Sequence, residues 1–189
     1  MSKTINQLTE TTTLDTNDLL HLVDVSANQD KKIKVANLWK GKPYGECYTY
    51  NNATNTVTPL DSAVFVTNSS AWTVTSGALN GFTLDTATGE LTYTGTEDII
   101  VSVNAFLSWY LIAGATEIRM LAEVFLNGVV VQNISAQQIL RDTAVEVETT
   151  AISGLVALTN GDVLAVKITN KTNSDATRVT NFNFNVKCL

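Results

Sequence analysis

Residues 101–109 read Val-Ser-Val-Asn-Ala-Phe-Leu-Ser-Trp, and their side chains alternate in character. The positions on one side are Val101, Val103, Ala105, Leu107 and Trp109, and those on the other are Ser102, Asn104, Phe106 and Ser108. Because successive side chains of a β-strand point to opposite faces, this period of two predicts a strand with one buried face. Trp109 is then expected in the core or at an interface between copies.

The same alternation recurs along the second half of the chain. It is found at Ile118, Met120, Ala122, Val124 and Leu126, at Leu164, Val166 and Ile168, and at Phe182, Phe184, Val186 and Cys188. Val145 and Val147 alternate with Glu146 and Glu148 and predict a further strand. The Asn127-Gly128 pair between two apolar runs predicts a β-hairpin.

Shorter strands are expected earlier in the chain. The candidates are residues 46–50, 63–67, 71–75, 82–84 and 90–93, with turns at Asn80-Gly81 and Thr88-Gly89. The 28 Thr and 18 Asn residues favour strands and turns, and no long amphipathic helix interrupts the pattern. We therefore predict an all-β protein, an antiparallel jelly-roll β-sandwich of about ten strands.

The chain divides into two parts of unequal size. Residues 1–42 contain six lysines and five acids, a net charge of +1, which leaves −7 for residues 43–189. Gly41 and Pro43 mark the boundary. The first part is expected to be an extended lead followed by a small β-hairpin with strands at residues 18–25 and 31–35. So few apolar groups cannot form an independent core, and the segment is expected to fold against a partner surface.

Charge and hydropathy exclude two classes of partner. The net charge is −6 and the isoelectric point is about 4.7, with only three arginines, so no nucleic-acid partner is expected. The sequence contains no apolar stretch of about 18 residues and no secretion signal at its start, so no membrane partner is expected.

Catalytic and metal-binding residues are sparse. The only histidine, His21, lies among leucines, and the acid pairs Glu97-Asp98 and Glu146/Glu148 are expected to be solvated surface groups. The oxygen-rich runs at residues 15–18 and 173–175 have ordinary turn chemistry. We therefore expect no catalytic residue, no metal site and no cofactor.

The two cysteines, Cys47 and Cys188, mark the first and last strands of the β part. A disulfide between them is conceivable, but Cys188 shares a face with Phe184 and Val186, which favours a buried free thiol.

Three aromatic residues could stack on sugar rings if exposed, namely Trp72, Trp109 and Tyr110. Trp109 follows the buried alternation, whereas Trp72 lies in a loop-like stretch. Trp72 is therefore the candidate for glycan contact.

The β part resembles the trimeric jelly rolls of the tumour-necrosis-factor and complement-globular-head type, and the similar domains of bacteriophage fibres and capsid decorations. The resemblance lies in residues 82–95, 101–108, 126–130 and 154–170 and covers roughly residues 46–189. It implies a homotrimer.

The N-terminal part resembles the short module that opens many phage tail-fibre and head-fibre proteins. The similar stretches are residues 5–10, 14–20, 23–24 and 31–38. This resemblance implies a virion-attachment segment. Its apolar docking contacts would be Ile5, Leu8, Leu20, Leu22, Leu38 and Trp39.

Together the resemblances imply a non-enzymatic bacteriophage virion protein, a capsid decoration or head fibre on the virion surface that is assembled in the host cytoplasm. Residues 1–42 would bind the major capsid protein or another virion protein. The alternative is a tail-fibre or tail-tip adhesin that binds a host receptor or surface glycan. A third interpretation, a cytokine-like or spore-surface trimer, is weakened by the absent secretion signal.

Overall fold

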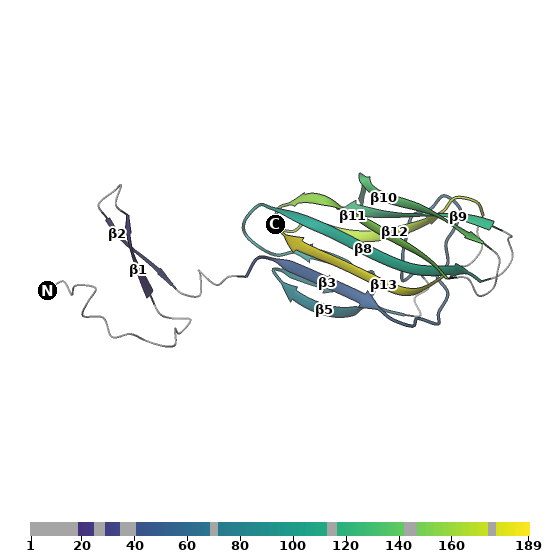
Figure 1. Cartoon of the computed structure of the whole chain (residues 1–189), viewed down its shortest axis with the longest axis horizontal. Coiled ribbons are helices and arrows are strands. Elements are labelled where there is room, and N and C mark those ends of the chain that lie inside the picture. The colour runs from purple at the N-terminus through teal and green to yellow at the C-terminus, as the bar shows by residue number, and fades with distance from the viewer. Residues whose placement is uncertain are drawn as a thin grey trace. The chain divides into compact units, whose positions relative to one another are not determined.

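The computed structural model describes residues 19–24, 29–34, 41–68, 72–112, 117–141, 147–173 and 177–189. These residues form strands and connecting loops, with no helix among them (Figure 1). Two compact units are present, Met1–Gly41 and Lys42–Leu189. The predicted all-β class is confirmed.

The first unit contains one antiparallel strand pair. β1 (Leu19–Asp24) pairs with β2 (Gln29–Lys34), and Leu22 lies opposite Lys31. Both strands fall in the region where the sequence predicts a small hairpin.

The second unit is a β-sandwich of two antiparallel sheets. The first sheet has the order β10-β9-β12-β7-β6, and the short β4 also pairs with β12. Its strands are β4 (Val64–Phe65), β6 (Phe82–Asp85), β7 (Glu90–Tyr93), β9 (Glu117–Leu126), β10 (Val129–Arg141) and β12 (Val163–Asn170).

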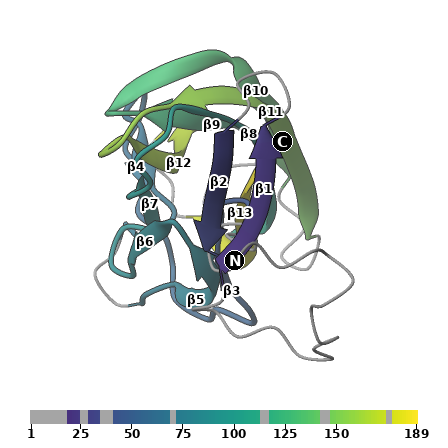
Figure 2. The same ribbon diagram turned by 90° about the vertical axis from the view of Figure 1, so that its left-hand side faces the viewer.

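The second sheet has the order β11-β8-β13-β3-β5. Its strands are β3 (Tyr44–Thr49), β5 (Thr75–Asn80), β8 (Ile99–Leu111), β11 (Glu148–Leu158) and β13 (Thr177–Cys188). Figure 2 shows the two layers from the end, with β12, β7 and β6 on one side and β11 and β8 on the other.

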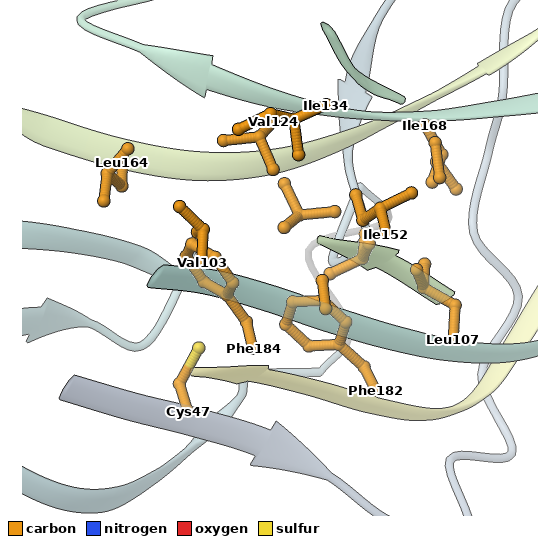
Figure 3. Close-up of a cluster of buried hydrophobic side chains, with 14 of the residues drawn as sticks. Cys47, Val103, Leu107, Val124, Ile134, Ile152, Leu164, Ile168, Phe182 and Phe184 are labelled. Atoms are coloured by element: carbon orange, nitrogen blue, oxygen red, sulfur yellow. The ribbon is translucent and has the colours of Figure 1, made fainter. Parts of the chain in front are cut away.

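The core lies between the two sheets and follows the predicted alternation. Each of the five expected positions on β8, from Val101 to Trp109, is buried, and so are Phe182, Phe184 and Val186 on β13. In Figure 3 the labelled side chains of both sheets point into the same interior space. Trp109 is fully buried within the chain, so it is a core residue.

The predicted Asn127-Gly128 hairpin joins β9 to β10. Both residues have positive φ angles, 51° and 79°, as the tight hairpin turn requires. The Asn127 side chain donates a hydrogen bond to Asp162 Oδ1 at 2.7 Å and accepts one from the Val163 amide at 2.9 Å. Two turns distant in sequence are thereby joined at one end of the sandwich.

Two predicted strands are wrong. Of the described residues 72–75, only Thr75 belongs to a strand, because β5 runs from Thr75 to Asn80 through Ser76-Gly77, a pair typical of a turn. Of the strand predicted around Val145 and Val147, Val145 and Glu146 lie outside the described residues, Glu148 begins β11, and Val147 is exposed just before it, whereas the first buried position of β11 is Thr150. Because the first inward position of β11 is the polar Thr150, the apolar alternation of this strand is not evident at its start.

The sandwich is closed along one side by contact between the edge strands β10 and β11. The β10–β9 register shifts between Val130 and Ser135, and Ile134 within this bulge is fully buried. Ile134 lies over Gly154 of β11, where an added Cβ would come within 2.5 Å of its Cδ1 and Cγ1. Glycine is required there because the isoleucine occupies the side-chain space.

Replacing Gly154 with valine is expected to destabilise the fold. The added methyl groups overlap Ile134, and overpacking of this kind costs about 1–3 kcal/mol in the free energy of unfolding. Urea denaturation measures the loss. Ser153→Val, at the exposed neighbouring position, is the matched control and should change stability by less than about 0.5 kcal/mol. Equal effects of the two substitutions would show that the contact is unimportant.

Candidate interaction surface

The side chains of the second sheet that point away from the core form one continuous surface, which we call the outer face. Strand register aligns them in rows across β11, β8, β13 and β3. The three central rows are Leu155–Ser102–Lys187–Tyr44, Ser153–Asn104–Asn185–Glu46 and Ala151–Phe106–Asn183–Tyr48.

Amide side chains are linked across the middle of the outer face. Asn104 Nδ2 donates to Asn185 Oδ1 at 3.4 Å, and Asn185 Nδ2 donates to Asn183 Oδ1 at 3.0 Å. Asn183 Nδ2 then donates to Glu46 Oε1 at 2.8 Å. A net contribution of about 1 kcal/mol is typical for each such bond. The network fixes the orientation of side chains that would otherwise be free rotors.

The half of the outer face formed by β8 and β11 carries three large exposed apolar side chains among polar ones, and we call it the apolar half. Ile100, Phe106 and Leu155 are 54%, 45% and 58% exposed. Small residues lie opposite two of them, since Ala157 pairs with Ile100 and Ala151 with Phe106. Large apolar side chains gathered on one flat face are typical of a surface that another protein covers.

The side of the first sheet that points away from the core differs from the outer face in its apolar exposure. Among the described residues, no exposed large hydrophobic side chain lies on β9 or β12. At the middle of β12, the Lys167 ammonium lies 4.5 Å from the ring centroid of Phe65 and 4.9 Å from that of Phe125. The cation covers both rings, so the middle of this sheet exposes little apolar surface, although Val129 at the β9–β10 hairpin is exposed.

The acidic pairs considered for catalysis do not converge. Glu97 and Asp98 are exposed in the loop before β8, whereas Glu148 lies opposite Trp109, near the other end of β8. Glu148 accepts a hydrogen bond from Gln138 Nε2 at 3.0 Å, and Glu146 lies outside the described residues. The backbone of His21 lies in β1.

Trp72, the candidate for glycan contact, lines a hollow of about 270 Å³ together with Phe65, Thr67, Asn68 and Thr73. Its side chain is half-buried and packs against the core, and its ring nitrogen is buried without a hydrogen-bond partner in the described structure. Only part of the indole therefore faces the hollow.

Of the residues expected to attach the protein to a particle, Leu20 and Leu22 lie in β1. Ile5, Leu8, Leu38 and Trp39 lie outside the described residues.

The two cysteines are free. Cys47 lies opposite Phe184, and Cys188 follows four residues further along β13, about 13 Å away at the usual rise of a strand. This separation exceeds the roughly 7 Å that a disulfide can span between Cα atoms. Burial, and then the neighbouring Glu46, raises the pKa of the Cys47 thiol to about 12.

Cys47 is expected to be unreactive in the folded protein. A thiol with a pKa of about 12 contains almost no thiolate at pH 8, and its side chain is fully buried. Titration with Ellman's reagent should therefore modify only the half-buried Cys188 in the folded chain and both cysteines after unfolding in guanidinium. Rapid modification of both in the folded chain, or a mass change on reduction, would contradict this arrangement.

The sequence matches no protein-family model and no curated protein. Within the described residues, no group of three or more His, Cys, Asp or Glu side chains is arranged to hold a metal ion. No helix in this part of the chain is long and apolar enough to span a membrane.

Proposed function

We propose that this chain is a non-enzymatic structural protein of a bacteriophage virion, a homotrimeric capsid decoration or head fibre. Residues 1–42 attach it to the major capsid protein or another virion protein, and the β-sandwich is displayed outward on the virion surface after assembly in the host cytoplasm. The observation that carries the proposal is the set of exposed apolar side chains on β8 and β11, where Leu155 lies diagonally next to Ile100 and Phe106 lies further along β8.

The strand order supports a jelly roll of the tumour-necrosis-factor type. From β6 onward the chain crosses repeatedly between the sheets, with β8, β11 and β13 in one and β7, the β9–β10 hairpin and β12 in the other. This interleaving is the order expected of that jelly roll, whose relatives in the resemblance above are trimers.

A contact between copies accounts for the apolar half of the outer face. In a solitary domain these side chains would remain in water, whereas burying about 100 Å² of apolar surface contributes roughly 2.5 kcal/mol. Alanines opposite Ile100 and Phe106 leave the surface flat enough for a second chain to approach. An acidic β part with a net charge of −7 supports dispersal of the assembled copies in solution.

The N-terminal unit supports an attachment role because it is a compact unit of its own. Met1–Gly41 separates from Lys42–Leu189 as a compact unit. A two-stranded pair alone is marginal in water, so a partner surface would supply the burial that it lacks.

Removal of residues 1–42 is expected to abolish attachment without unfolding the β-sandwich. The truncated chain should stay soluble and oligomeric but should not bind virion particles in a co-sedimentation assay. Trp39→Ser in the full chain should weaken binding in the same direction, and Val129→Ser, at an exposed hairpin position, is the matched control. Normal decoration by the truncated chain would overturn the attachment role.

The second candidate is a tail-fibre or tail-tip adhesin that binds a host receptor or glycan, and the hollow beside Trp72 is the observation that favours it. Under this hypothesis Trp72→Phe, which keeps an aromatic core contact but shortens the ring, lowers binding to host cells at least severalfold. Phe65→Leu, on the same hollow, is the companion variant. Unchanged binding by both variants would remove this site from consideration.

A further inference from the structure

A second hollow, of about 480 Å³, opens on the outer face between β8 and β13. Its lining includes Lys42, Ser102, Asn104, Asn185 and Lys187, with Cys188 and Leu189 at its rim. Hollows of about 300–1,000 Å³ commonly hold small molecules.

Backbone hydrogen bonds and strand pairing place both lysines at this hollow. The Cys188 amide donates to the Pro43 carbonyl at 2.9 Å, which holds the residue after Lys42 against the end of β13. Asn80 Nδ2 donates to the Lys42 carbonyl at 3.3 Å. Lys187 pairs with Ser102 on one side and Tyr44 on the other, so its side chain emerges beside the amide network.

The lining of the hollow contains more positive than negative charge, with two lysines and the terminal carboxylate of Leu189. No ion pair in the described structure involves Lys42 or Lys187, and no Asp or Glu side chain lines the hollow. By contrast, Lys171 pairs with Asp61 at 3.0 Å. Two lysines against one carboxylate leave a net positive charge at this hollow on an otherwise acidic domain, and this charge favours an anion.

Neutral donors complete the hollow. Asn104 Nδ2 donates to Ser102 Oγ at 3.2 Å, so the Ser102 hydroxyl accepts that bond and keeps its own hydrogen for a ligand. Asn104 and Asn185 are bonded to each other and are held in place before any ligand binds. Tyr44, exposed beside Lys187, offers an aromatic surface at the edge.

We propose that this hollow binds an oxyanion, with Lys42 and Lys187 neutralising its charge and the Ser102 hydroxyl donating to one of its oxygens. Charge-assisted hydrogen bonds of this kind are short and strong. The oxyanion is either the carboxylate of an acidic sugar, whose ring would lie against Tyr44, or a free phosphate. Lys42 is also the last residue of the proposed attachment segment, whereas the hollow at Trp72 shares no lining residue with this site.

Isothermal titration of the full chain with glucuronate and with inorganic phosphate, at constant ionic strength, tests the proposal. Lys42→Gln and Lys187→Gln should each weaken binding about tenfold, the loss expected for one charged hydrogen bond. Arg119→Gln removes one positive charge from an exposed position on β9 and should leave the affinity unchanged. Unfolding midpoints without ligand establish that each variant folds.

The two ligands distinguish the sources of the oxyanion. Tighter binding of glucuronate than phosphate, with the preference lost in Tyr44→Ala, identifies an acidic sugar. Equal binding that is insensitive to Tyr44 identifies a simple anion site. No saturable binding of either ligand, or equal losses in Arg119→Gln and Lys187→Gln, would overturn the proposal. The mass of the protein in solution, measured in parallel, shows whether the proposed trimer forms. Failure of anion binding is thereby distinguished from failure of the trimer proposal.

Discussion

The inward alternation of β8, paired on one side with β13 and on the other with β11, is the constraint on which the rest of the structure depends. Val101, Leu107 and Trp109 are buried against the first sheet. A one-residue slip in register would turn these side chains to solvent and bring Phe106 inside, so burial of the core fixes the register. Every outward position on the second sheet is then determined as well.

The outer face is a direct consequence of that register. Fixing Val103 and Ala105 inward places Asn104 outward beside Asn185, which is the first link of the amide network. The same register sets Phe106 and Leu155 on one half and Lys187 on the other. The proposed contact surface for a second copy and the anion-binding hollow therefore meet on β8, where Ser102 lies opposite Leu155.

Much of the fold could be predicted from the sequence, because the long strands alternate strongly and the Asn127-Gly128 turn has a specific backbone requirement. β5 and the start of β11 could not, since Gly77 and Thr150 interrupt the apolar pattern and their places depend on neighbouring strands.

The surface was less predictable than the core. The exposed position of Phe106 follows from the alternation alone, but the hollow joins Lys42, Ser102 and Asn185, residues that only the tertiary pairing brings together. The partial burial of Trp72 likewise depends on packing against the core, which a loop-like stretch of sequence does not reveal.

Three copies are expected to associate through the apolar half of the outer face. Sedimentation equilibrium of the full chain measures this association. The expected mass is three times the 20.4 kDa of the single chain, and Phe106→Asp should reduce it to that of one chain while Val129→Asp leaves it unchanged. A wild-type mass of 20.4 kDa at micromolar concentration, or an oligomer that survives Phe106→Asp, would contradict it.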